Sequence, residues 1–149
     1  MTLLELLRRS TEFLISKKIE NAKCDAEWMI SSVLNCSRLA LYVDGNQKLN
    51  EEQEQQFHAM LLRRADREPL QYILGEVEFF GVRLRVDSRV LIPRSETEWL
   101  VEWVSKKIGS VLSILDLGTG SGAIAIALAK QFPQSEILAV DRSPQGGWM

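Results

Sequence analysis

Three glycines at alternate positions, between two short apolar segments, constrain the fold of this chain more than any other feature. Gly118, Gly120 and Gly122 follow an apolar segment at residues 112–117 and precede a segment rich in small residues at 123–130. A strand, a glycine loop, a helix and a second strand in this order are typical of a βαβ unit, whose strands run parallel with a right-handed crossover. The sequence therefore predicts a parallel sheet near the C-terminal end.

The second apolar segment, residues 137–140, ends at Asp141. Glycines permit positive φ and let a ligand approach the main chain closely, and the helix behind the loop offers free backbone N–H groups. Doubly wound sheets bind ligands at the carboxyl ends of parallel strands, where an acidic residue accepts hydrogen bonds from ribose hydroxyls. We therefore predict a nucleotide-type cofactor site that contains the loop and Asp141.

The loop fits two cofactor patterns. Gly118-x-Gly120-x-x-Ala123 fits the dinucleotide fingerprint with alanine in third place, whereas Asp116-x-Gly118-x-Gly120-x-Gly122 fits the first motif of class I methyltransferases. A carboxylate two residues before the first glycine would crowd a pyrophosphate, but it suits the ammonium group of a methionine moiety. The sequence thus favours S-adenosyl-L-methionine, with capping of the loop backbone as the structural alternative for Asp116.

The sequence of the N-terminal half predicts helices. Thr2-x-x-Glu5 and Asn50-x-x-Gln53 are capping-box patterns, each with a polar cap residue and a carboxylate or amide three residues later. Apolar residues recur at helical spacing after both caps. We therefore predict that the first and the last helix of a small bundle begin at these two caps.

Further element boundaries follow from local signals. Two more helices are expected at residues 25–34 and 37–42, and Pro69 is predicted to end the last helix, because the residue before a proline avoids the helical region. Residues 76–86 are rich in β-branched and aromatic side chains and predict a hairpin that turns near Gly81.

One more helix is expected between the hairpin and the glycine loop. Ser95 is predicted to cap it, with the carboxylates of Glu96 and Glu98 in its first turn, where they favour the positive helix end. Its predicted apolar face consists of Trp99, Leu100, Trp103 and Val104.

Composition excludes several classes of protein. Of the 149 residues 46% are hydrophobic and 26% charged, and the formal net charge is -2, as in a soluble globular protein and unlike the strongly basic nucleic-acid binders. The densest basic group, Arg63, Arg64 and Arg67, is interspersed with acidic residues, which predicts a solvated helix face; the alternative is contact with a protein or RNA partner.

Neither a metal site nor a membrane span is expected. Cys24 and Cys36 form no C-x-x-C pair and lack neighbouring histidines. The N-terminus carries charge early, at Glu5, unlike a signal peptide, and no segment approaches the roughly 18 apolar residues of a membrane helix. We therefore expect a cytoplasmic protein, and a monomer.

The chain resembles the HemK/PrmC family of release-factor glutamine methyltransferases in segments beyond the loop. The resemblance is carried by residues 68–75 (EPLQYILG), 79–81 (FFG), 90–98 (VLIPRSETE) and 114–125 (ILDLGTGSGAIA). The family methylates the side-chain amide nitrogen of the glutamine in the Gly-Gly-Gln motif of bacterial peptide chain release factors. It combines an N-terminal helical bundle, a linking hairpin and a C-terminal methyltransferase domain.

The resemblance implies a cofactor, a partner and site residues. S-adenosyl-L-methionine would be held through its methionine part by the loop and through its ribose by Asp141, with Pro93 and Arg94 near the substrate. The helical bundle would engage the release factor, and no direct contact with nucleic acid is implied. The implied cofactor-binding residues are Asp116, Gly118, Thr119, Gly120, Ser121, Gly122 and Asp141.

The expected fold class is α/β with an all-α N-terminal domain. A helical bundle at residues 1–74 is followed by a β-hairpin linker at 75–88 and, at 89–149, by the start of a class I (Rossmann-like) methyltransferase sheet. We expect this last domain to be incomplete, because two strands and one helix leave apolar faces uncovered.

Three departures from the family bear on activity. Ser95 stands where the family has proline, the catalytic Asn-Pro-Pro-Tyr motif is absent, and residues 145–149 no longer resemble the family. We therefore expect a truncated version of a longer enzyme, with no catalytic residues of its own and little activity alone. The alternatives are a non-catalytic helical protein-binding module and an NAD-dependent oxidoreductase.

Overall fold

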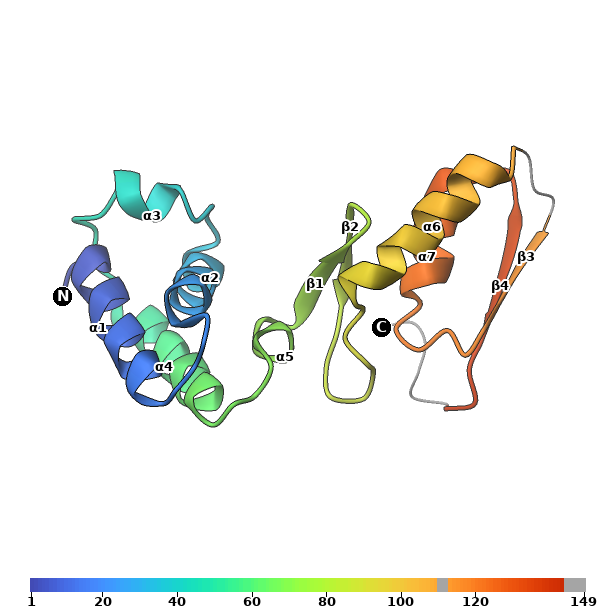
Figure 1. Ribbon diagram of the computed structural model, residues 1–149. Coiled ribbons are helices and arrows are strands. Elements are labelled where there is room, and N and C mark those ends of the chain that lie inside the picture. The colour runs from blue at the N-terminus through green and yellow to red at the C-terminus, as the bar shows by residue number, and fades with distance from the viewer. Residues whose placement is uncertain (110–112, 144–149) are drawn as a thin grey trace. The chain divides into compact units, whose positions relative to one another are not determined.

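The computed structural model describes residues 1–109 and 113–143, in which helices are followed by two small sheets (Figure 1). The chain divides into two compact units, a helical unit at Met1–Leu74 and an α/β unit at Gly75–Met149. The elements are α1 (Leu3–Ser16), α2 (Ala22–Leu34), α3 (Ala40–Val43), α4 (Glu51–Ala65), α5 (Leu70–Leu74), β1 (Glu76–Phe79), β2 (Val82–Arg85), α6 (Ser95–Lys107), β3 (Ser113–Leu117), α7 (Ala123–Gln131) and β4 (Glu136–Val140).

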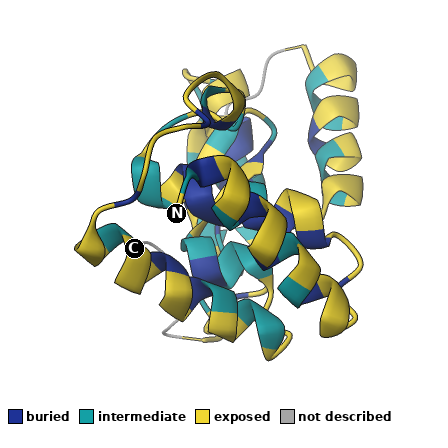
Figure 2. Cartoon of the chain, turned by 90° about the vertical axis from the view of Figure 1, so that its left-hand side faces the viewer, coloured by how far each residue is buried: buried dark blue, intermediate teal, exposed yellow. Residues whose placement is uncertain are grey.

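The helical unit encloses its own hydrophobic core. The buried residues lie on the inner faces of the helices, and the exposed ones lie on the outer faces (Figure 2). Apolar residues recur at helical spacing on α1, α2 and α4, and burial of these faces stabilises the bundle. The core consists of Leu3, Leu7, Leu14, Ile19, Ala22, Ala26, Met29, Ile30, Leu41, Leu49, Phe57, Met60 and Ile73.

Both predicted capping boxes are confirmed. The Glu5 backbone N–H donates to Thr2 Oγ1 over 3.3 Å, and the Thr2 N–H donates to Glu5 Oε2 over 3.0 Å. At α4, the Gln53 N–H donates to Asn50 Oδ1 over 2.8 Å and the Asn50 N–H donates to Gln53 Oε1 over 3.0 Å. Each pair satisfies two backbone donors that the helix itself leaves free.

The predicted end of α4 at Pro69 is wrong. The helix ends at Ala65, and Arg67 adopts a positive φ of 68°. The Glu68 N–H then donates back to the Arg63 carbonyl over 3.2 Å, which closes the helix end as left-handed caps commonly do. Pro69 instead precedes the short helix α5, and its carbonyl accepts from the Ile73 N–H.

Two other helix boundaries also differ from the prediction. The second helix begins at Ala22 rather than at residue 25, and the third covers Ala40–Val43 rather than 37–42. The Ala40 N–H donates to the Ser37 carbonyl in a turn, so the residues before Ala40 form a turn that leads into α3.

The basic group at the C-terminal end of α4 is only partly a solvated helix face. Arg64 Nε donates to Asp25 Oδ2 on α2 over 2.7 Å, and the two side chains are 18% and 7% exposed. The predicted solvated face is therefore wrong for Arg64, which joins α2 to α4. Arg63 forms a more exposed ion pair with Glu68.

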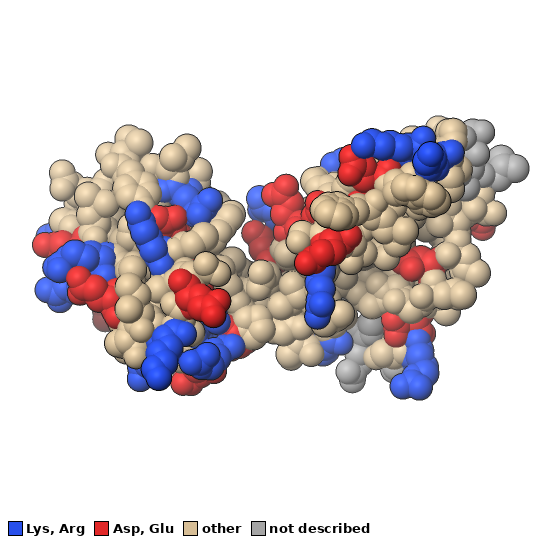
Figure 3. Space-filling view, viewed as in Figure 1, with Lys and Arg blue, Asp and Glu red and all other residues tan. Residues whose placement is uncertain are grey.

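Charges of both signs are interspersed over the surface of the helical unit. On the face drawn in Figure 3, positive and negative side chains lie next to one another rather than in areas of one sign. One ion pair of this unit, between Arg8 and Glu12, joins two exposed side chains four residues apart on α1. Such exposed pairs contribute little to stability.

The predicted hairpin is confirmed in the α/β unit. Strands β1 and β2 pair antiparallel, with Phe79 opposite Val82, and the turn at Phe80 and Gly81 has φ values of 48° and 68°. Two positive φ values match the turn that fits the twist of a two-residue hairpin.

The hairpin shares a core with the helices of the α/β unit. Phe79 and Leu84 pack in one cluster with Val101 of α6 and with Ala123, Ala127 and Leu128 of α7. Lys130 Nζ also donates to the Gly81 carbonyl over 2.9 Å. The segment that the sequence suggests as a linker is thus packed against α6 and α7.

Strands β3 and β4 pair in parallel, as predicted, with Ser113 opposite Glu136 and Leu117 opposite Val140. Residues 111 and 112, which the sequence assigns to the region where this strand begins, lie outside the described residues. Ile114 and Ile137 pack against the core that contains α7. Alternate side chains on these strands are exposed, namely Leu115, Leu117, Leu138 and Val140.

Two predictions about α6 are wrong. Ser95 is the first residue of the helix and not its cap; Arg94 occupies the cap position, without a side-chain cap. Val101 is the fully buried residue of the helix, whereas most of the predicted apolar face is exposed. The exposed residues are Trp99, Leu100 and Trp103, and Val104 is half-buried.

Candidate cofactor-binding loop

The glycine loop lies at the carboxyl ends of β3 and β4. Because the two strands are parallel and in register, Leu117 and Val140 end side by side. The Gly118 and Thr119 N–H groups both donate to the Val140 carbonyl, over 2.7 and 3.1 Å. These two bonds continue the strand pairing into the loop, so the loop starts at a fixed position above the sheet edge.

The loop backbone requires glycine at three positions. Gly118, Gly120 and Gly122 have φ values of 76°, 56° and 76°, a region that disfavours other residues. Gly122 is also the cap residue of α7. Apart from the adjoining residues, no atom of residues 1–109 and 113–143 lies within 4 Å of a Cβ added at Gly118 or Gly120, so the described chain leaves space there that a ligand can fill. The loop therefore fits a group that binds backbone closely.

Asp141 joins the second strand to the loop. Its Oδ2 accepts from the Gly120 N–H and its Oδ1 from the Ser143 N–H, both over 2.8 Å. The hydrogen bonds from the Ser143 and Gly120 backbone, in that order of importance, lower the pKa of the Asp141 carboxyl below its usual range. Asp141 is thus an ionised acceptor beside the loop, as ribose recognition requires.

Asp116 also contacts the loop through a side chain. Thr119 Oγ1 donates to Asp116 Oδ2 over 2.7 Å, in a partly buried setting. Sequence reasoning placed both residues in the site but did not foresee this bond. The only signal for it is the spacing of three residues across the turn, which a hydroxyl and a carboxylate commonly bridge. Ser121, between the two last glycines, is half-buried.

Pro93 and Arg94 form no hydrogen bond with these loop residues in the described part of the chain. They directly precede α6, where Pro93 is half-buried and Arg94 is exposed. The Arg94 carbonyl accepts from the Thr97 N–H in the first turn of that helix. The hydrogen bonds of the loop in residues 113–143 join Asp116, Asp141 and the glycines, and do not include these two residues.

The described residues were also searched for a metal site and for a membrane-spanning helix. Within residues 1–109 and 113–143, no group of three His, Cys, Asp or Glu side chains is placed to hold a metal ion. Cys24 is exposed, Cys36 is half-buried, and both are free thiols. The helices in the same residues are all too short or too polar to span a membrane.

Comparison with known proteins identifies the relatives of this chain. Residues 5–75 match the family model described as the PrmC N-terminal domain. The match covers the helical unit and stops at the start of the hairpin.

Curated relatives extend the similarity beyond that domain. The release factor glutamine methyltransferase of Geobacter sulfurreducens is 42% identical over 143 residues, which are 96% of this chain and 50% of that protein. The proteins of the same name from Deinococcus radiodurans and Coxiella burnetii are 38% and 45% identical, over 97% and 81% of this chain and 53% and 44% of their own lengths. The chain thus spans about half the length of the curated relatives that it matches. From the bundle to the glycine loop, this chain belongs to the family of release factor glutamine methyltransferases.

Proposed function

We propose that this chain carries the cofactor-binding loop of an enzyme that uses S-adenosyl-L-methionine to methylate the N5 atom of the glutamine in the Gly-Gly-Gln motif of peptide chain release factors. The main support is the geometry of the loop. Three positive-φ glycines lie at the ends of two parallel strands, and the Asp141 carboxylate is held beside them by the Gly120 N–H. Family membership favours this cofactor over the dinucleotide of an NAD-dependent oxidoreductase.

The loop residues would bind and orient the cofactor without a metal. Gly118 and Gly120 leave room for the methionine part to approach the main chain, and Thr119, Ser121 and Gly122 complete the loop. Asp141 accepts hydrogen bonds from the ribose hydroxyls. Asp116 attracts the ammonium group. When bound, the cofactor supplies a methyl group on a sulfonium centre for direct displacement.

The acceptor atom sets a further requirement. The amide nitrogen of glutamine is a weak nucleophile because its lone pair is delocalised into the carbonyl, so it must be held in line with the methyl group. By resemblance, an Asn-Pro-Pro-Tyr motif does this in the family, and these 149 residues do not contain it. We therefore expect the 149-residue polypeptide to bind cofactor but to transfer little methyl group. Pro93 and Arg94 would lie near the substrate.

The proposal is tested by calorimetric titration of the purified chain with S-adenosyl-L-methionine, in wild type and in Asp141→Asn. We expect binding by the wild type and weaker binding by the variant, because the amide replaces one of the two oxygens that accept from Gly120 and Ser143 by an NH2 group, which donates. The matched control is Asp66→Asn, which changes an exposed carboxylate of the helical unit. Absence of binding by a folded wild-type chain, as judged by circular dichroism, would contradict the proposal.

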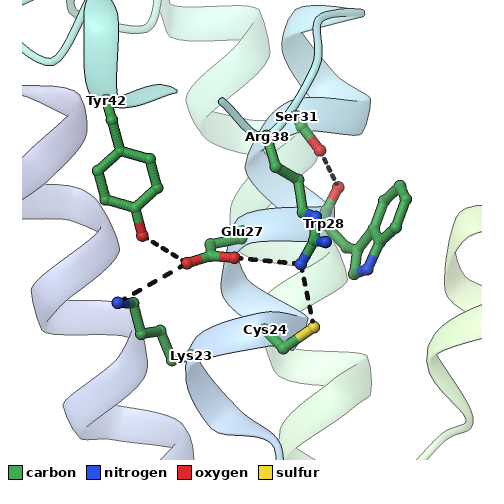
Figure 4. A network of polar contacts seen from close by, with 7 residues as sticks. All are labelled: Lys23, Cys24, Glu27, Trp28, Ser31, Arg38 and Tyr42. Atoms are coloured by element: carbon green, nitrogen blue, oxygen red, sulfur yellow. Dashed lines mark hydrogen bonds and ion pairs between the residues drawn. The ribbon is translucent and has the colours of Figure 1, made fainter. Parts of the chain in front are cut away.

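A second candidate function is protein binding by the helical unit. Glu27 of α2 accepts from Tyr42 Oη over 2.5 Å and from Arg38 Nη1 over 3.3 Å, and Lys23 Nζ lies 4.0 Å from the same oxygen that Tyr42 contacts (Figure 4). The Arg38 guanidinium stacks 4.7 Å above the Trp28 ring. Trp, Tyr and Arg are the side chains that dominate binding energy at protein interfaces.

The surface around this network is apolar as well as charged. Leu39 and Val43 are 79% and 83% exposed, and Trp28 and Tyr42 are also exposed. The test is capture of purified release factor by the chain, comparing wild type with Leu39→Ser and with a control such as Glu52→Gln on α4. Equal capture by all three would contradict a role for this surface.

The remaining proposals concern setting and assembly. The net charge of -2 and the mixture of charges support action on a protein rather than on nucleic acid. We also propose that the chain acts as a monomer and in the cytoplasm, where release factors work. Sedimentation of the purified chain tests the first of these, and a dimer at micromolar concentration would contradict it.

A further inference from the structure

Thr119 is held at several points of the loop. Its N–H donates to the Val140 carbonyl over 3.1 Å, and its carbonyl accepts from the Gly122 N–H over 2.9 Å. Its hydroxyl is thereby aimed back at β3, where it donates to Asp116 Oδ2 over 2.7 Å. The hydroxyl is therefore a fixed donor rather than a rotating surface group.

The hydroxyl engages only part of the Asp116 carboxylate. An ionised carboxylate has two oxygens and accepts about four hydrogen bonds. In the described part of the chain, Oδ2 has Thr119 as its donor, whereas Oδ1 has none. The neutral hydroxyl also leaves the negative charge intact, which a lysine or arginine partner would not. Within the described residues, Asp116 thus keeps one oxygen without a donor, in an orientation set by the loop.

We propose that Thr119 is a positioning residue. It orients the Asp116 carboxylate so that the second oxygen accepts a hydrogen bond from the ammonium group of the methionine moiety. The inference rests on the proposed function and adds a role for a side chain between the glycines. Orientation matters because an oriented acceptor loses less side-chain entropy when the ligand binds. The loop glycines and Asp141 would bind the rest of the cofactor independently of Thr119.

The alternative is that Thr119 only stabilises the loop. In that case its hydroxyl would support the binding of every adenosine-containing ligand, because the whole loop would depend on it. The two roles are separated by a pair of neutral thioethers. S-adenosylhomocysteine carries the amino-acid portion, and methylthioadenosine shares its adenosine and sulfur but has no ammonium group.

The experiment is calorimetric titration of the full chain with both thioethers. We expect Thr119→Val to lower the affinity for S-adenosylhomocysteine about tenfold and the affinity for methylthioadenosine less than about twofold. Thr119→Ser keeps the donor and should restore most of the affinity. Asp116→Asn removes the charge to be oriented, so adding Thr119→Val to it should cost little more affinity for S-adenosylhomocysteine.

Matched removal of a hydroxyl elsewhere controls for the substitution. Thr11 Oγ1 is buried and has no hydrogen-bond partner in the described part of the chain, and Thr11→Val should leave both affinities unchanged. If Thr119→Val lowers the affinity for both thioethers equally, or for neither, the positioning role is overturned and the proposed function stays intact. Failure of the wild type to bind S-adenosyl-L-methionine overturns the proposed function and this inference with it.

Discussion

Replacement of Arg64 by methionine should destabilise the helical unit strongly. The substitution keeps the apolar stem but leaves the Asp25 carboxylate, whose side chain is 7% exposed, without its cation. It also removes the bond from Arg64 Nη1 to the Glu68 carbonyl. Loss of one partner of a buried pair costs about 3–5 kcal/mol. Because the Arg64 side chain is 18% exposed, water can reach the site, and we expect about 3 kcal/mol, the lower end of that range.

That cost is large for a unit of this size. At about 0.05–0.15 kcal/mol per residue, Met1–Leu74 has a free energy of unfolding of roughly 4–11 kcal/mol. Guanidinium chloride unfolding measures the loss. Trp28 is the only tryptophan of residues 1–74, so its fluorescence reports the helical unit once Trp99, Trp103 and Trp148 are replaced by phenylalanine. Asp25→Asn added to Arg64→Met should recover at least about 1 kcal/mol, since it removes the unpaired charge.

An exposed ion pair on the same unit is the matched control. The side chains of Arg8 and Glu12 are 66% and 61% exposed, and Arg8→Met should cost less than about 0.5 kcal/mol. If Arg64→Met costs no more than Arg8→Met, then the Asp25–Arg64 pair is not a structural link and the reasoning from burial fails.

Two further predictions concern the loop. Gly118→Ala should lower the free energy of unfolding by about 1–2 kcal/mol because its φ is 76°. It should also weaken the binding of S-adenosyl-L-methionine at least about tenfold, because the added Cβ fills the open space. An unchanged affinity in calorimetry would contradict the proposed approach of the ligand to the main chain. Folding lowers the pKa of the Asp141 carboxyl, so the unfolded chain binds more protons than the folded chain. The stabilising contribution of Asp141 is therefore complete above about pH 5. It is lost as the pH falls through the lowered pKa. The difference in unfolding free energy between wild type and Asp141→Asn should therefore shrink below about pH 4, and a difference that persists to pH 2 would contradict the assignment.

Local signals predict helix starts better than helix ends in this chain. The caps at Thr2 and Asn50 are reciprocal bonds between residues three apart, so the sequence alone specifies them. The end of α4 depends on Arg67, a residue whose left-handed conformation carries no sequence signal. Pro69 is the visible signal, and it precedes the next helix, α5.

The buried face of α6 could not be predicted, because the helix has apolar residues on more than one side. Val101 lies two positions from Trp99 and from Trp103, which places it about 200° around the helix from each. The small residues Ala123 and Ala127 are part of the cluster in which Val101 is buried, and this tertiary packing decides which side faces inward.

For the candidate site, the spacing of the glycines predicted the loop, and the apolar segment at residues 137–140 predicted where the second strand ends. The bonds within the site were not predictable to the same degree. The Asp141–Gly120 bond joins residues 21 positions apart and depends on the register of two strands. Arg64 and Asp25, 39 positions apart, are a second case in which a long-range contact overrides a local interpretation.

The two separate cores set the order of events during synthesis. The core of the helical unit includes no residue beyond Leu74, whereas the β3–β4 pair needs the chain to Val140. At about 5–20 residues per second, the ribosome takes roughly 3–13 s to add the 66 residues from 75 to 140. Helical bundles fold in microseconds to milliseconds. The helical bundle of the nascent chain is therefore folded before β4 has been synthesised and can pair with β3.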